Sequence, residues 1–312
     1  MSAYVVFTKV TRAVVTMWFV ATFSFVILSL SGDPIEIMVG DDAPLDVIEY
    51  YKELYGFNRP LHEQYVSYME AILRGDFGIS YADDTPALDL VLEAVPNTLI
   101  LGFSALALAL SLGIFLGFVA ALNRNSWLDR TIMSFAVFGF SIPNFFLGIL
   151  LILLFAMVWR LLPSAGDGSL AHLILPVITM GTSGAASIAR FMRSSVLDVL
   201  NQPYIRAAKA KSVPTLNLLL RHVFPNAAIP VITILGFRLG DLVAGAIVVE
   251  TVFAWPGMGR LLVGAVLSRE LAIVQTILIL TAFTMVIANL LVDMLYGWVD
   301  PRVRGIDTAK ER

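Results

Sequence analysis

The 312-residue chain contains no cysteine and only three histidines. The missing cysteine excludes a disulfide framework, a thiolate metal site and a cysteine nucleophile. His62, His172 and His222 are widely separated and do not show the spacing of metal ligands. The sequence also lacks a Gly-x-x-x-x-Gly-Lys-[Ser/Thr] loop, so the chain cannot cradle nucleotide phosphates in the usual way.

Charged residues are also scarce, at 14% of the chain, whereas hydrophobic residues make up 58% and the mean hydropathy is +0.82. These values differ strongly from those of a soluble domain and predict a polytopic membrane protein. Apolar runs long enough to cross a bilayer predict six transmembrane helices. The runs cover about 13–30, 98–122, 131–159, 172–189, 225–253 and 272–292.

The net charge of −3 says little, because the two signs are distributed unequally along the chain. Basic residues lie in short segments beside the spans, as at Lys9, Arg12, Arg124 and Arg130, and in the C-terminal tail. The positive-inside rule therefore places both termini in the cytoplasm, with the first run as an uncleaved helix. Residues 32–96 are acidic with few basic residues, and we expect this segment to be extracytoplasmic.

Two amphipathic helices are predicted within the acidic segment, at 44–55 and 60–74, each with a proline near its start. In the second, Leu61, Tyr65 and Tyr68 fall on one face. A packed structural cap is favoured over a ligand site for this face.

Several polar or helix-breaking residues lie inside the apolar runs. Pro143 is expected to kink the third run, because its ring removes a backbone donor. The last two runs hold Arg238, Asp241, Glu250 and Asp293. Charges at membrane depth are costly, so they normally pair or face a water-filled interior, and Arg238 can pair with Asp241 one turn away.

Residues 203–226 form a polar, basic interruption between two apolar runs. Arg206, Lys209 and Lys211 have alanines between them, which predicts a short helix whose small side chains let another surface come close. Pro203 stands near its start and Pro214 just past its end, where proline delimits a helix. The alternative interpretation is an ordinary basic loop on the inner side of the membrane.

This stretch resembles the cytoplasmic coupling loop of the membrane subunits of ABC importers. That signature reads Glu-Ala-Ala, three residues, Gly, nine residues, an apolar residue, any residue, then Leu-Pro. Here Arg-Ala-Ala at 206–208 stands for the first three residues, and Phe-Pro at 224–225 stands for Leu-Pro. Ser212 replaces the glycine, which would permit a positive φ at the helix end.

Other segments carry the same resemblance along nearly the whole chain. Arg-Phe-Met-Arg-Ser-Ser at 190–195 is similar to a family segment before the coupling loop, and Gly-Asp-Phe-Gly at 75–78 to a segment of the dipeptide and oligopeptide permeases. Residues 250–260, which begin with Glu250, resemble Glu-x-Val-Phe-x-x-Pro-Gly-x-Gly-Arg, and 289–304 resemble the terminal signature. The chain is thus similar to the first permease subunit of dipeptide, oligopeptide or nickel ABC importers.

The resemblance implies an all-α polytopic protein with the type I ABC importer permease fold and an extracytoplasmic helical insert between the first two of six transmembrane helices. We expect the N-terminus and first helix at 1–31, the insert at 32–96, a permease core with five spans at 97–304, and a cytoplasmic tail at 305–312. The expected location is the cytoplasmic (inner) membrane of a bacterium or archaeon.

The resemblance also implies a transporter subunit rather than an enzyme. Its expected partners are a second homologous permease, two ATP-binding subunits, an extracytoplasmic solute-binding protein and the lipid bilayer, with no nucleic acid. This chain is expected to bind no cofactor, with ATP and Mg²⁺ held by the partner subunits. The residues expected to couple it to the ATPases are Tyr204, Arg206, Ala207, Ala208, Lys209, Ala210, Lys211, Ser212, Pro225 and Asn226.

Two alternatives stay open. An ion-coupled secondary transporter would use the intramembrane charges Arg238, Asp241, Glu250 and Asp293, which together with Pro143 are the candidate pathway or helix-packing residues. Gly-Thr-Ser-Gly at 181–184 resembles an intramembrane protease motif, but small residues in a packed helix explain it better. The substrate is open among dipeptides, oligopeptides, nickel chelates, opines and glutathione-like compounds.

Overall fold

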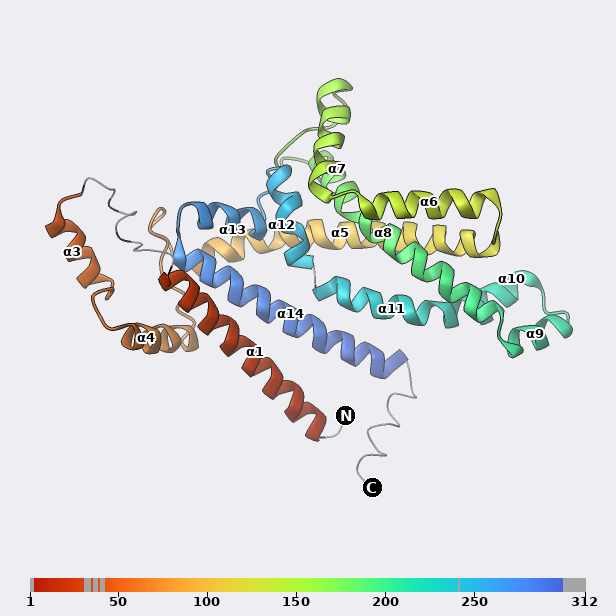
Figure 1. Cartoon of the computed structure of the whole chain (residues 1–312), viewed down its shortest axis with the longest axis horizontal. Coiled ribbons are helices and arrows are strands. Elements are labelled where there is room, and N and C mark those ends of the chain that lie inside the picture. The colour runs from red at the N-terminus through yellow and green to blue at the C-terminus, as the bar shows by residue number, and fades with distance from the viewer. Residues whose placement is uncertain (1–2, 31–34, 36–38, 40–42, 241, 300–312) are drawn as a thin grey trace. The chain divides into compact units, whose positions relative to one another are not determined.

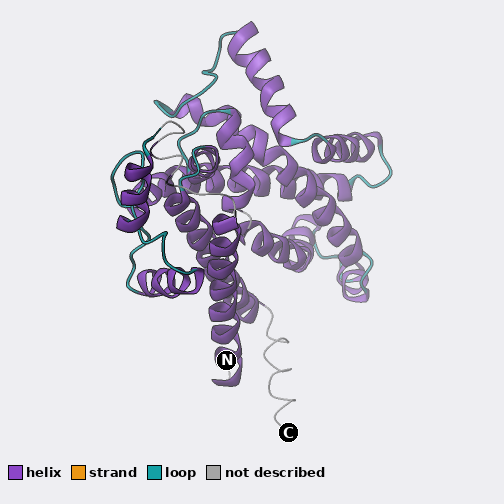
Figure 2. Ribbon diagram, turned by 60° about the vertical axis from the view of Figure 1, so that its left-hand side comes forward, coloured by secondary structure: helices purple, strands orange, loops and turns teal. Residues whose placement is uncertain are grey.

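The computed structural model describes residues 3–30, 35, 39, 43–240 and 242–299, and these residues form helices and loops without any strand (Figure 2). An isolated bridge pairs Ile79 with Pro86. The contacts divide the chain into two compact units. The described residues of the first lie in Met1–Asn97 and Pro256–Ile287, and those of the second in Thr98–Trp255 and Ala288–Arg312.

The long apolar helices agree with the six runs expected from the sequence. Within the described residues, five segments are long and apolar enough to cross a membrane, and a bent helix pair makes a sixth. The five are Phe7–Ile27 in α1 (Ala3–Leu30), Ala87–Leu122 (α5), Leu170–Leu200 (α8), Thr215–Gly236, and Leu271–Leu291 in α14 (Leu271–Val299) (Figure 1).

The bent pair corrects the expectation for Pro143. The third run is broken and not merely kinked, because α6 (Trp127–Ser141) and α7 (Asn144–Leu151) meet at 102°. Ile142 is extended with ψ 125, as expected for a residue whose α region is blocked by the following proline ring. Pro143 then caps the start of α7, which continues into the π-helix η1 (Ile152–Val158).

The fifth run is also divided into short elements. It comprises α10 (Thr215–Leu218), the π-helix η2 (Leu219–Val223), α11 (Phe224–Gly240) and α12 (Leu242–Val252). Asp241 lies outside the described residues, so its pairing with Arg238 stays a prediction. Asp293 belongs to α14, in a part of the helix whose side chains are not described.

In the first unit, the two predicted amphipathic helices are confirmed as α3 (Leu45–Leu54) and α4 (Leu61–Leu73). The Tyr65 hydroxyl lies 2.8 Å from that of Thr22 in α1, and the Tyr68 hydroxyl lies 3.2 Å from that of Ser24. Both tyrosine rings also contact Phe25 of α1, with centroids 5.4 and 5.3 Å away. Tyr65 and Tyr68 of the predicted face are therefore packed against α1, whereas Leu61 is exposed.

A buried carboxylate organises another part of the first unit. Glu270 follows α13 (Met258–Leu267) and accepts the backbone N–H groups of Tyr81 at 3.0 Å and Ala82 at 2.7 Å. Burial raises the pKa of the Tyr81 phenol to about 12, with smaller contributions from Tyr55 and Glu270. This carboxylate ties the loop before α5 to the start of α14.

The second unit is built around α8, against which α6, α7, α11 and α12 all pack. The portion of α5 in this unit meets α8 through glycines. A Cβ atom on Gly113 would lie 2.7 Å from the Ile188 Cβ and 2.8 Å from the Ala185 carbonyl oxygen. From the other helix, a Cβ on Gly184 would lie 2.8 Å from the Ala109 Cβ. The Gly-xxx-Gly pair that includes Gly113 thus permits a close approach of two backbones.

We expect Gly113→Ala to destabilise the chain by about 1–3 kcal/mol, because an added methyl group must displace the Ala185 backbone or the Ile188 side chain. The measurement is thermal unfolding of the detergent-purified protein. Gly264→Ala in α13 is the matched control, because no heavy atom lies within 4 Å of its Cβ position. An equal stability of the two variants would contradict the close approach of α5 and α8.

Candidate coupling site

The basic stretch predicted as a coupling loop begins with the helix α9 (Pro203–Ala210), only two residues after α8. Pro203 occupies the first turn, where its missing N–H costs nothing and its fixed φ suits a helix. The N–H of Ile205 donates to the Gln202 carbonyl at 3.1 Å. The turn from α8 into α9 is therefore short and hydrogen-bonded, as Figure 1 shows at the C-terminal end of α8.

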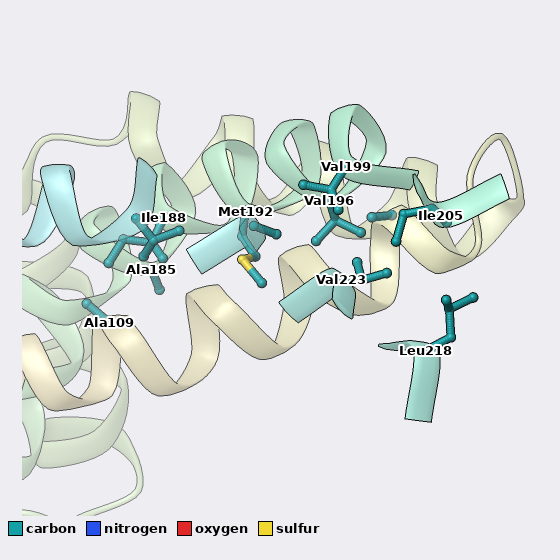
Figure 3. Close-up of a cluster of buried hydrophobic side chains, with 12 residues drawn as sticks. Ala109, Ala185, Ile188, Met192, Val196, Val199, Ile205, Leu218 and Val223 are labelled. Carbon is teal, nitrogen blue, oxygen red and sulfur yellow. The ribbon is translucent and has the colours of Figure 1, made fainter. Parts of the chain in front are cut away.

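One side of α9 is anchored in a buried apolar cluster (Figure 3). Ile205 is fully buried there, beside Val196 and Val199 from α8. Leu218 of α10 and Val223 of η2 belong to the same cluster. The loop 203–226 is therefore packed onto the C-terminal end of α8 at both of its own ends.

The remaining side of α9 is bare. Of the ten predicted coupling residues, nine have exposed side chains: Tyr204, Arg206, Ala207, Lys209, Ala210, Lys211, Ser212, Pro225 and Asn226. Ala208 differs, because it is half-buried and packs against the apolar cluster. Asn226 also has a local role, since its side-chain amide donates to the His222 carbonyl at 2.7 Å.

Ser212 ends the helix in the geometry that glycine normally supplies. Its φ is +57, and its N–H donates to the Lys209 carbonyl at 2.9 Å. The next N–H, of Val213, donates to the Ala208 carbonyl at 3.2 Å. These two bonds form a Schellman motif, which requires a left-handed residue. The loop geometry that the replacement of glycine had put in question is thus kept, with serine in a left-handed conformation.

A buried ion pair near this site was not predicted from the sequence. The Arg193 guanidinium donates to both carboxylate oxygens of Asp129, through Nε at 2.6 Å and Nη2 at 2.8 Å. The backbone N–H of Asn125 donates to the same carboxylate at 2.9 Å. The available signal was Ser126-x-x-Asp129 at the start of α6, where the Ser126 hydroxyl accepts the Asp129 N–H. Arg190, one turn from Arg193, lies 4.7 Å from the Phe140 ring centre.

The described candidate pathway residues differ in their surroundings. Glu250 is fully buried at the end of α12, and the Thr98 hydroxyl donates to its carboxylate at 2.6 Å. Arg238 is half-buried in α11, and Pro143 is exposed at the break between α6 and α7. Ser183 of the protease-like motif donates to the Met180 carbonyl at 3.4 Å, within its own helix.

We expect Ser212→Gly to stabilise α9 by about 1 kcal/mol, because glycine adopts a positive φ without strain. The measurement is hydrogen exchange of the α9 backbone amides, which should become slower as local opening of the helix becomes rarer. Lys211→Gly is the matched control, since the φ of Lys211 is −82 and glycine there should only loosen the helix end. Faster exchange in Ser212→Gly would show that the left-handed turn does not limit the helix.

Sequence families identify what kind of protein carries this site. Residues 113–305 match the family described as binding-protein-dependent transport system inner membrane component. Residues 1–102 match the N-terminal family of the same membrane components. Together these two matches cover nearly the whole chain.

Curated relatives and a solved structure agree with the family. The glutathione transport system permease proteins GsiC of Escherichia coli (strain K12) and of Shigella flexneri serotype 5b are each 39% identical over 290 residues, 93% of this chain and 95% of the relative. A structure of the MetNI methionine ABC transporter in an inward-facing conformation matches with a TM-score of 0.59 at 19% identity. The match covers 68% of this chain and 96% of the other, and confirms the expected type I importer permease fold. The chain belongs to the inner-membrane permease subunits of binding-protein-dependent ABC importers, which are multi-pass transporter proteins and not enzymes.

Proposed function

We propose that this permease forms half of the translocation pathway of an importer driven by ATP hydrolysis in two partner subunits, to which it is coupled through the loop 203–226. The observation that carries the proposal is α9, which is anchored on one side and bare on the other. A second, homologous permease would supply the other half of the pathway. ATP and Mg²⁺ would bind only to the ATPase subunits, because this chain has no phosphate-binding loop.

The exposed face of α9 suits a protein partner. Ala207 and Ala210 are small, so a partner surface can come close, while Arg206, Lys209 and Lys211 offer positive charge to acidic groups. Tyr204, Leu216 and Leu220 add large exposed apolar side chains near the same segment. Aromatic and apolar anchors surrounded by charge are typical of protein interfaces.

The attachment of α9 to α8 explains how a push on this face would reach the membrane. The two helices share a buried cluster that includes Val199 and Ile205, and only two residues connect them. The Ser195 hydroxyl also donates to the Ala227 carbonyl of α11 at 2.9 Å. Movement of α9 would therefore carry α8 and α11 as a rigid body rather than bend a flexible loop.

The proposed cargo is a peptide or a related small solute, brought to the outer face by an extracytoplasmic binding protein. The names of the curated relatives support this class, since glutathione is a short peptide derivative. Opines and nickel chelates belong to the same range of expected solutes. With α9 facing the ATPases, both termini would lie in the cytoplasm, in agreement with Lys9 and Arg12 before the first span.

The secondary-transporter alternative is not favoured. Its candidate Glu250 is fully buried and hydrogen-bonded to Thr98, which is typical of a structural carboxylate. Family membership with binding-protein-dependent permeases also implies ATPase and solute-binding partners rather than an ion gradient.

We expect Ala207→Glu to remove the ATPases from the complex, because the new carboxylate adds bulk and negative charge at the centre of the bare face. Ala207 is chosen because its side chain is exposed. The neighbouring Ala208 packs against the buried cluster, so its substitution would disturb folding as well as binding. The measurement is a tagged pull-down from the native membrane in mild detergent, with partners identified by mass spectrometry.

Ala165→Glu is the matched control, because Ala165 is also exposed but lies in the loop between η1 and α8, which is expected to be outside. This control should retain two ATPases and a second permease. Recovery of the same ATPases with Ala207→Glu would contradict the assignment of the interface. Recovery of the unaltered chain alone, or only with copies of itself, would contradict the proposed assembly.

A further inference from the structure

A buried polar contact joins the inner end of α6 to α8. Asp129, Ala136 and Gly139 are the buried residues of α6, every residue of which is described. In the first two turns only Asp129 is buried, while Trp127 and Arg130 are exposed. The outer half of α6 meets α8 differently, through the close approach of Gly139 to Thr182. The Asp129 carboxylate is thus the buried side chain through which the inner end of α6 contacts α8.

That carboxylate is fully engaged. Its side chain is 4% exposed, and both of its oxygens accept from the forked guanidinium of Arg193. A bidentate pair fixes orientation as well as distance, unlike a single contact to lysine. The loop before α6 contacts the same carboxylate. Asn125 in this loop has a φ of +64 and donates its backbone N–H to Asp129.

Arg193 stands on the part of α8 that carries the coupling site. Its neighbour Met192 and the following Val196 belong to the buried cluster that holds Ile205 of α9. Ser195, two residues on, bonds to α11. At the other end of α6 lies the 102° break at Pro143. Broken helices at membrane depth are tolerated where they are buried in protein or line a water-filled cavity, so this break is a natural place for a gate.

We infer that the Asp129–Arg193 ion pair is the joint that passes movement of α9 and α8 to the broken span α6–α7. The inference rests on the proposed coupling to ATPases and adds to it a pair of positioning residues. When an ATPase subunit pushes on α9, α8 moves with it and displaces the Arg193 guanidinium. The carboxylate follows because, at 4% exposure, it has little access to water that could replace the guanidinium, and α6 pivots at its inner end.

The missing cysteines allow a direct test, since a single introduced thiol is the only one in this chain and its labelling is read on the separated permease subunit. Ala210→Cys places a thiol on the bare face of α9, and Ser141→Cys places one beside the break; both positions are exposed. The rate of maleimide labelling of each is measured in the tagged complex in lipid nanodiscs, with and without ATP and vanadate. With the ion pair intact, nucleotide should change the rate at both thiols.

Asp129→Asn keeps the shape of the side chain and removes its charge. We expect nucleotide still to change labelling at Ala210→Cys, whereas the change at Ser141→Cys falls by about fivefold or more, the lower end of a typical coupling between sites. Glu70→Gln is the matched control, because it removes an ion pair with Arg74 whose side chains are 59% and 77% exposed. It should leave both responses unchanged.

An undiminished response at Ser141→Cys in the Asp129→Asn variant would overturn the inference, as would equal losses at both thiols or no response at Ser141→Cys in the unaltered chain. No response at Ala210→Cys in the unaltered chain, without ATPases in the complex, would instead contradict the proposed function. Should Asp129→Asn fail to assemble, Arg193→Lys is judged by the same criteria, since it keeps the charge but not the fork.

Discussion

The close approach of α5 and α8 is the contact on which the second unit depends. In lipid, apolar side chains gain little by leaving their surroundings, so helices associate through tight packing of small residues. Gly113 and Gly184 provide that packing, each leaving no room for a methyl group against the facing helix. With α8 held in this way, one helix serves as a common support for α6, α7, α11 and α12, and its C-terminal end carries α9.

The three buried carboxylates among the described residues are compensated locally, which favours structural over transport roles for them. Asp129 is neutralised by Arg193, Glu250 accepts from Thr98, and Glu270 accepts two backbone N–H groups. Breaking such a contact would leave a polar group without compensation in an apolar interior, at considerable cost. These carboxylates therefore fix the positions of helices and loops, and their burial argues against a role in carrying ions.

Local pattern was enough to predict the apolar spans, the amphipathic helices α3 and α4, and the short helix α9. Contacts between residues far apart in the sequence could not be predicted in the same way. Asp129 and Arg193 are 64 residues apart, and their meeting depends on how α6 and α8 cross, which no single-sequence period contains. Pro143 shows a similar limit, because proline forbids a regular helix but its neighbours in space decide between a kink and a break. The positive φ of Ser212 could be anticipated only from the family glycine.

The contrast between Ala207 and Ala208 shows what a helix provides at 203–210 that an extended loop would not. Neighbouring residues of a helix lie about 100° apart around its axis, so one alanine can face the core while the next faces solvent. The bare face is thereby presented on an element whose other face is locked by Ile205 to α8. An extended loop with the same residues would change its conformation when a partner pushed on it. The push would then not be passed on to α8. Under the proposed coupling, rigidity of the anchored face, more than the identity of the exposed side chains, would let this small helix transmit force to the membrane-spanning helices.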